Sequence, residues 1–352
     1  MRLRAAGLAL ACAFATAIGV RAETHDRLDL ALPTDNHALL EGGGAAFYQV
    51  IERDFGGVKT KPWQGGRYGF VRNPLRTAEG LTYTRFHEGI DIRPLHRDAA
   101  GEPLDEVRAI AAGTVVYVNR SPALSNYGNY VVVEHRWDGC RYYSLYGHLG
   151  SVTAAIGEPV DRGTALGILG YTGEGLNRER AHLHLELNLM LSRAFASWHT
   201  RFFPTDRNPH GIYNGIYNGI NLSGIDIARL YLALRKRPML TIPEFLAAEK
   251  VFYRVEVPAS KNFYLAEAYP WLLGGQRTAE AAGAFEISFN AAGVPVKISS
   301  RSLTIAEPQL ISVAPRPIDY TYLTRGQIGG SGAQPVLTES GKRQMQLLTW
   351  PE

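Results

Sequence analysis

The chain has 352 residues, of which 45% are hydrophobic, so it can bury sizeable cores, and its length suggests two domains. Its formal charge is +4, from 37 Lys and Arg against 33 Asp and Glu. Three of these arginines lie in the first 22 residues, and without them the charge falls to +1. This excludes the strong basic field that nucleic-acid binding requires.

The first 22 residues have the pattern of a secretory signal peptide. Arg2 and Arg4 precede an apolar run that ends at Val20, and the small residue Ala22 follows. The run is shorter than the ~20 residues that span a bilayer. We therefore expect cleavage after Ala22, export to the periplasm or beyond the cell, and no transmembrane segment in the mature chain. The mature chain then keeps Cys140 alone, and a single thiol cannot form an internal disulfide.

The stretch from Ala109 to Leu189 predicts a compact domain of antiparallel β-sheet. It consists of short β-branched or alternating runs between turn residues, with no helix-length repeat. The expected strands are 113–118, 130–134, 141–146, 165–169 and 182–187. Upstream, the polar stretch from Arg93 to Glu106 is expected to form a surface loop able to overhang a site.

The last third of the chain combines helical and strand-like patterns. A repeated unit in 211–219, Gly-Ile-Tyr-Asn, is typical of a connector rich in turn residues. After it, helical spacing covers 226–237 and 243–252, and Pro243 suits a first helical turn. Strand-like runs at 284–289 and 294–298 enclose a hairpin signal. We expect a small α+β or β domain here.

Two segments offer side chains that bind metals. On the strand 182–187, alternation places His182, His184 and Glu186 on one face. Two histidines ~7 Å apart can both bind one metal, or one can bind while the other acts on a metal-bound water, and spacing alone leaves both open. The segment His87-Glu-Gly-Ile-Asp91 adds an imidazole and a carboxylate. Because cysteine is nearly absent, these ligands favour a catalytic zinc with an open position.

His148 is the third element, at the end of the run Ser144-Leu-Tyr-Gly-His-Leu149. With the three segments in this order, the chain resembles the lysostaphin or LytM type of zinc endopeptidase, which cuts peptide bonds in bacterial peptidoglycan. The resemblance covers about Gly66 to Leu189. Further segments that carry it are 68–74, 111–115, 127–135, 157–163 and 170–173.

The resemblance implies the fold and the roles of the site residues. The fold is mainly β, an antiparallel sheet of the duplicated hybrid motif type that floors a narrow groove. His87, Asp91 and His184 are expected to bind one Zn²⁺ per chain, and His148 and His182 to be catalytic, as base and as donor to the oxyanion in an order that the sequence leaves open. Glu186 is expected to orient a neighbouring imidazole. The expected divisions are a 23–60 extension, a 61–200 zinc metallopeptidase domain, a 201–225 linker and a 226–352 domain of unknown role.

Two stretches depart from the pattern of the family. Residues 93–106 lengthen the connection after Asp91, and residues 174–181 replace a Gly, Ser and Thr-rich run before the final histidines. Both are expected to wall the groove and to affect substrate preference. The remaining candidates receive structural interpretations: His96, His135, His199, His210 and Cys140.

The expected substrates are peptide stems or cross-links of peptidoglycan. One alternative is a non-catalytic LytM-like module that regulates other cell-wall hydrolases, and another is a zinc peptidase that acts on proteins. All three expected ligands and both further histidines are present, which favours the enzyme. Since they all precede Leu189, hydrolysis is not expected to require residues 226–352. The sequence does not predict the oligomeric state.

Overall fold

The computed structural model describes residues 26–78, 80–205, 215–261, 263–275, 282–316, 319–330 and 334–351. The expected signal peptide, the first part of the 211–219 repeat and His210 lie outside these residues. Within the described ranges, no helix combines the length and the apolar character needed to cross a membrane.

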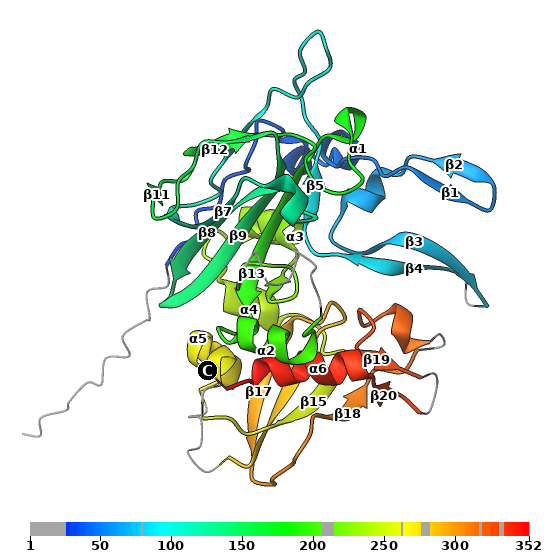
Figure 1. Ribbon diagram of the computed structural model, residues 1–352, viewed down its shortest axis with the longest axis vertical. Helices are drawn as coiled ribbons and strands as arrows, with labels where there is room; N and C mark the ends of the chain where they lie inside the picture. Colours follow the sequence, from blue (N-terminus) through cyan, green and yellow to red (C-terminus); the bar gives the residue numbers. More distant parts are fainter. Residues whose placement is uncertain are drawn as a thin grey trace, which may run out of the picture.

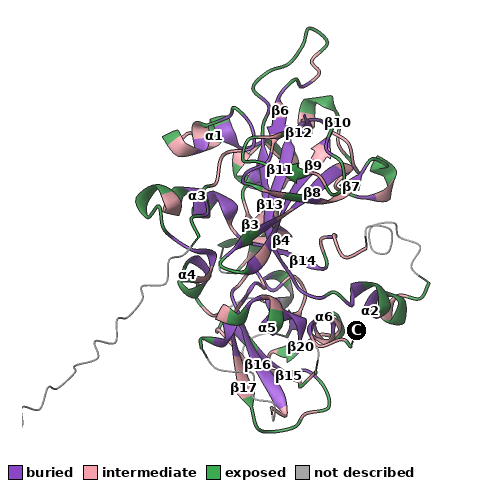
Figure 2. Cartoon of the chain, turned by 90° about the vertical axis from the view of Figure 1, so that its left-hand side faces the viewer, coloured by how far each residue is buried: buried purple, intermediate pink, exposed green. Residues whose placement is uncertain are grey.

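The largest sheet is antiparallel and has the strand order β11–β7–β8–β9–β13–β14, with β5 also paired to β13. Its strands are β5 (Ile90–Ile92), β7 (Gly113–Asn119), β8 (Asn129–Trp137), β9 (Cys140–Leu149), β11 (Pro159–Val160), β13 (Leu183–Met190) and β14 (Leu222–Gly224). The odd-numbered leucines of β13, from Leu183 to Leu189, are fully buried. Alternation along the strand therefore leaves its other face for polar side chains, and Figure 2 shows the interior strands of the sheet as buried.

A smaller sheet and two hairpins surround this sheet. The smaller sheet has the order β10–β12–β6, from Ser151–Val152, Ala165–Ile168 and Glu106–Arg108. One hairpin pairs β1 (Arg53–Phe55) with β2 (Val58–Thr60), and the other pairs β3 (Gly69–Thr77) with β4 (Gly80–His87). Both project from the same side of the molecule (Figure 1). Arg76 lies 4.8 Å from the centroid of the Phe55 ring, so the two hairpins support each other.

The C-terminal region holds another antiparallel sheet, in the order β17–β16–β15–β18. These strands are β15 (Tyr253–Pro258), β16 (Ala284–Phe289), β17 (Pro295–Arg301) and β18 (Gln309–Val313), and the short strands β19 (Ile328–Gly329) and β20 (Val336–Leu337) pair nearby. The α-helices are α1 (Gly44–Phe47), α2 (Phe195–Phe202), α3 (Ile227–Lys236), α4 (Ile242–Ala247), α5 (Tyr264–Ala268) and α6 (Glu339–Leu348). The 3₁₀ turns are η1 (Ala38–Glu41), η2 (Trp63–Gly66), η3 (Pro122–Leu124), η4 (Arg178–Arg180), η5 (Pro270–Leu273) and η6 (Tyr320–Tyr322).

The two regions pack directly against each other. The Tyr269 hydroxyl accepts a hydrogen bond from the amide of Met190, at the end of β13, at 2.8 Å. The indole of Trp198 on α2 donates to the carbonyl of Arg343 on α6 at 3.0 Å. A hydrophobic cluster continues from the large sheet into β15 and β16. The C-terminal region is therefore joined to the large sheet through buried surface.

The sequence-based expectations can now be compared with these elements. The mainly β fold with antiparallel sheets is confirmed, and so are the helix at 227–236 and the hairpin of β16 and β17 around Gly293. The helix expected over 243–252 begins with Pro243 in its first turn but ends at Ala247, because the chain turns there into β15. The β3–β4 hairpin and the helices α2 and α6 were not predicted.

Candidate metal centre and groove

The register of β13 places the candidate metal ligands together. His184 pairs with Asp91 of β5 on one side and with Gly147 of β9 on the other. His87 ends β4, and the turn through Gly89 leads into β5. A Cβ atom on Gly89 would lie 2.3 Å from the carbonyl oxygen of Leu185, so a glycine is needed for this turn to pack against β13.

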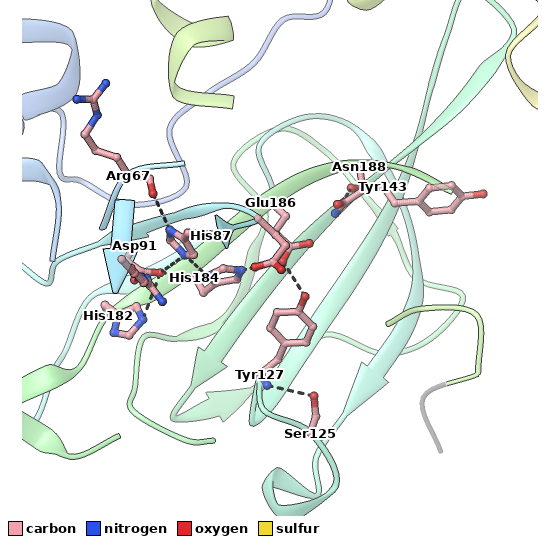
Figure 3. A network of polar contacts seen from close by, with 12 residues as sticks. Arg67, His87, Asp91, Ser125, Tyr127, Tyr143, His182, His184, Glu186 and Asn188 are labelled. Carbon is pink, nitrogen blue, oxygen red and sulfur yellow. Dashed lines mark hydrogen bonds and ion pairs between the residues drawn. The ribbon is translucent and has the colours of Figure 1, made fainter. Parts of the chain in front are cut away.

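Three atoms from these residues face one another. Asp91 Oδ1 lies 3.0 Å from His87 Nε2 and 3.0 Å from His184 Nδ1. The two imidazole nitrogens are 3.1 Å apart. All three side chains are buried, and they form a possible metal-binding group (Figure 3).

The hydrogen bonds of the outer ring nitrogens leave the inner nitrogens able to act as acceptors toward a metal ion. His87 Nδ1 donates to the carbonyl of Arg67 at 2.8 Å, and His184 Nε2 donates to Glu186 Oε1 at 2.8 Å. Once deprotonated, the inner nitrogen of each ring can therefore present a lone pair beside the carboxylate of Asp91. Three acceptors so close together need a positive charge between them, supplied by a proton or by a metal ion. Their separations approach the ~3.3 Å edge of a tetrahedron with zinc–nitrogen bonds of ~2.0–2.1 Å, so the residues fit Zn²⁺.

Charges around the cluster favour the ionised carboxylate. Burial would raise the pKa of Asp91, but the neighbouring His182, His87 and Arg72 hold it well below its usual value. Arg72 on β3 donates to Asp91 Oδ2, so Oδ1 is the oxygen left to face the imidazoles. Burial also lowers the pKa of His87. It acts in the same sense on His184, but the hydrogen bonds that this ring donates to the carboxylates of Asp91 and Glu186 raise its pKa to about 10. A metal ion at this position would therefore replace the proton that His184 Nδ1 otherwise shares with Asp91.

His148 and His182 lie beside the cluster. Their ring centroids are 4.7 Å apart, and the His148 ring is 5.7 Å from that of His184. His182 Nδ1 donates to the carbonyl of Arg180 at 2.7 Å, and His148 Nδ1 donates to that of Thr172 at 2.9 Å. Each ring therefore keeps Nε2 for other partners, and His182 Nε2 is 3.4 Å from Asp91 Oδ1.

The backbone of His148 is unusual. Its φ of 63° lies in the left-handed region, which costs free energy for any residue except glycine. The amide of His148 donates to the carbonyl of Tyr127 at 2.7 Å, which holds this conformation. The strained backbone turns the imidazole toward His182, so the fold fixes the position of this ring.

A second carboxylate supports the cluster from behind. The Tyr127 hydroxyl donates to Glu186 Oε1 at 2.8 Å, and the same oxygen accepts from His184 (Figure 3). Glu186 thus lies where sequence alternation predicts it, against a neighbouring imidazole. Tyr127 was not predicted as part of the site, and no local pattern could have found it because it lies 59 residues from Glu186 in the sequence.

The cluster lies in a groove of about 1130 Å³. Its rim includes Arg53, Arg85, Glu174, Leu176, Arg180, Ile220 and Arg325. They come from the two hairpins, from the loop before β13, and from segments after β13. The expectation that residues 93–106 wall the groove is wrong, because none of them lines it; instead Arg97 bonds to the carbonyls of Gly101 and Arg178 on the outside. From the stretch 174–181, four residues do line it: Glu174, Gly175, Leu176 and Arg180.

Other candidates lie outside the cluster. His135 is fully buried, and its ring contacts the Ala112 carbonyl at 2.8 Å and the Ser144 hydroxyl at 2.7 Å. Burial lowers its pKa to about 4, so it is a neutral structural residue at neutral pH. His96 lies 3.6 Å from Asp105 at the surface. Cys140 is a buried free thiol, and His199 is buried in α2 beside the groove.

Comparison with known proteins supports the interpretation of these motifs. Residues 85–194 match the model of peptidase family M23. Residues 85–194 therefore form a domain of peptidase family M23. Among the curated proteins, none matches this sequence.

Three solved structures show local similarity. A zinc-containing peptidase from Vibrio cholerae is 26% identical over 40% of this chain and 36% of its own, with a TM-score of 0.26. The catalytic domain of lysostaphin from Staphylococcus simulans is 25% identical over 36% of this chain and 82% of its own, with a TM-score of 0.25. The catalytic domain of a prophage-encoded M23 protein from Enterococcus faecalis is 21% identical over 41% of this chain and 86% of its own, also with a TM-score of 0.25. This chain thus spans about a third of the Vibrio protein.

Proposed function

We propose that the protein is an exported zinc metalloendopeptidase that hydrolyses peptide bonds in bacterial peptidoglycan. The observation that carries the proposal is the set of three buried acceptor atoms on His87, Asp91 and His184, which face one another at the bottom of the groove. The match of residues 85–194 to peptidase family M23 supports the reaction class.

The chain would hold the metal through His87 Nε2, Asp91 Oδ1 and His184 Nδ1, one ion per chain. Three protein ligands leave the fourth position of a zinc ion open for water. Zinc held by these ligands would lower the pKa of that water and polarise a carbonyl group. Glu186 fixes the tautomer of His184, and the Arg67 carbonyl fixes that of His87.

His148 and His182 would act on the reacting groups and not on the metal. The Nδ1 proton of each ring is held by a backbone carbonyl, so Nε2 is the atom that can take a proton or, when protonated, donate a hydrogen bond. One imidazole would serve as base toward water and the other as donor to the developing oxyanion.

The groove would accept an extended peptide that passes between the hairpins and the loop 174–180. Peptidoglycan stems and cross-links are peptides of this kind and carry free carboxylates, and the arginines of the rim would attract them. The signal-peptide pattern of residues 1–22 supports export. We also propose that the chain divides into a 61–200 peptidase domain, a 201–225 linker and a 226–352 domain.

The test is digestion of purified peptidoglycan by the full-length mature protein loaded with zinc. The expected result is release of peptide fragments, identified by mass, that stops on chelation and returns with zinc. A variant with His184→Ala is the matched control. Cleavage of casein but not of peptidoglycan would favour a peptidase that acts on proteins, and zinc binding without any cleavage would favour a regulatory module.

A further inference from the structure

One arginine of the C-terminal region contacts both neighbours of His87. The guanidinium of Arg325 lies 5.0 Å from the centroid of the Phe86 ring. It also forms an ion pair with Glu88 at 3.3 Å. These two residues precede and follow the expected zinc ligand directly, and Arg325 lies 237 residues away from Glu88 in the sequence. The contacts therefore reach the metal-binding segment from outside the peptidase domain.

The loop that carries Arg325 is held firmly by its own region. Arg325 has a φ of 59°, a left-handed conformation that costs free energy in a residue with a side chain. The Thr324 hydroxyl accepts from the amide of Ile328 at 2.9 Å. The side chain of Gln327 accepts from the hydroxyl of Tyr253, on β15, at 2.6 Å. The guanidinium is thus presented by a turn that the C-terminal sheet anchors.

The metal-binding segment is packed from both sides. On one side, Gly89 lies so close to β13 that a Cβ atom would reach within 2.3 Å of the Leu185 carbonyl. On the other, a Cβ atom on Gly224 would lie 2.2 Å from the carbonyl of Glu88. The side chains of Arg325 and Glu88 are 24% and 30% exposed, so their ion pair is only partly screened by water. Loss of Arg325 would break the ion pair through which the C-terminal region holds the side chain of Glu88.

We propose that Arg325 is a positioning residue, through which the C-terminal region holds His87 in the geometry that binds zinc. The inference rests on the proposed function for the identity of the metal. It gives a role to residues 226–352, and it argues against the expectation that hydrolysis does not require them. Arg325 also lines the groove, so direct contact with substrate is the competing interpretation.

The experiment compares Arg325→Ala with Arg325→Lys and Glu88→Gln in the full chain. Arg316→Ala is the matched control, because Arg316 makes a cation–π contact of the same 5.0 Å length, but with Phe252 and away from the groove. Zinc affinity is measured by competition with a chromophoric chelator. The values of kcat and KM are measured with a peptidoglycan peptide as substrate. The rate of amide hydrogen exchange at residues 86–91 is measured in the metal-free protein.

For Arg325→Ala we expect zinc affinity to fall by about tenfold or more, in the range typical of residues that orient metal ligands. Exchange at 86–91 should become faster, and kcat should fall while KM changes little. Glu88→Gln should reproduce the loss, the double variant should be no worse than Arg325→Ala, and Arg325→Lys should restore part of it. Arg316→Ala should match the native protein.

Unchanged zinc affinity and unchanged exchange in Arg325→Ala would overturn the proposal, and a rise in KM alone would instead make Arg325 a substrate contact. The exchange measurement needs neither zinc nor substrate. If the native protein cleaves no peptidoglycan, the proposed function fails, yet faster exchange in Arg325→Ala alone would still support the positioning role.

Discussion

The floor and the rim of the groove are built in different ways. On the floor, the four polar residues His87, Asp91, His182 and His184 are each at most 5% exposed. Their positions follow from the register of one strand with its neighbours and from backbone carbonyls that fix ring tautomers. The rim consists of exposed or half-buried side chains, several of them arginines, from loops and hairpins.

This difference separates two properties of the protein. Atoms on the floor are already in place before any ligand arrives, which is the preorganisation that catalysis requires. Apart from Arg325, the residues of the rim can change without disturbing the sheet, and they meet the parts of a substrate that lie away from the scissile bond. We therefore expect substitutions on the floor to act on metal binding and kcat, and most substitutions on the rim to act on KM.

The largest effect is expected for the three candidate ligands. Alanine at His87, Asp91 or His184 removes one of the three expected metal ligands. Two ligands should not hold the ion, so stoichiometric zinc and all measurable hydrolysis should be lost. Metal content of the purified variants measures this, with circular dichroism as the control for folding. Full zinc occupancy in all three folded variants would show that the ion binds elsewhere.

The next effect separates catalysis from metal binding. His148→Ala and His182→Ala should keep zinc, because neither ring supplies a ligand, and should lose ~10²–10⁴ in kcat. Metal analysis and single-turnover kinetics on the same samples give both quantities. If either variant loses its zinc, that histidine belongs to the ligand set, and full activity would remove it from the mechanism.

A smaller effect is expected behind the floor. Glu186→Gln keeps the shape of the side chain that faces His184 but removes its charge, and should weaken zinc binding about 10- to 100-fold. Tyr127→Phe removes only one hydrogen bond to Glu186 and should cost less. Zinc titration of both variants measures the order. A larger loss in Tyr127→Phe than in Glu186→Gln would mean that the hydroxyl has a direct role at the site.

The comparison also explains what the sequence could predict. The alternation of His182, His184 and Glu186 with leucines is a local pattern, and it placed these side chains on one face correctly. The pairing of His184 with Asp91 is not local, since it depends on the register of two strands far apart in the chain. Only the resemblance to a known family connected them in advance.

The rim was harder to predict. The β3–β4 hairpin contains Pro74, a positive φ at Asn73 and a bulge near Phe70, which interrupt the alternation by which strands are recognised. The loop 93–106 looked like a wall by its length alone, yet it folds away from the groove. Arg325 gave no signal, because nothing near it in sequence indicates that its turn reaches Glu88.

The smallest effect is expected on the rim, at Arg85. It pairs across the hairpin with Arg72, and both line the groove. Arg72 is paired with Asp91, whereas Arg85 has no side-chain partner in the described part of the chain. Two like charges therefore lie opposite each other, and only one of them has an anionic partner. A carboxylate of the substrate would supply the anionic partner that Arg85 lacks. An exposed charge pair contributes about 0.2–1 kcal/mol, so Arg85→Ala should raise KM by a factor of about 1.4 to 5, less at high salt, with kcat and zinc unchanged. Arg76→Ala, on the same hairpin but in contact with Phe55, is the control. A fall in kcat without a change in KM would place Arg85 with the floor, and the distinction between floor and rim would fail at this hairpin.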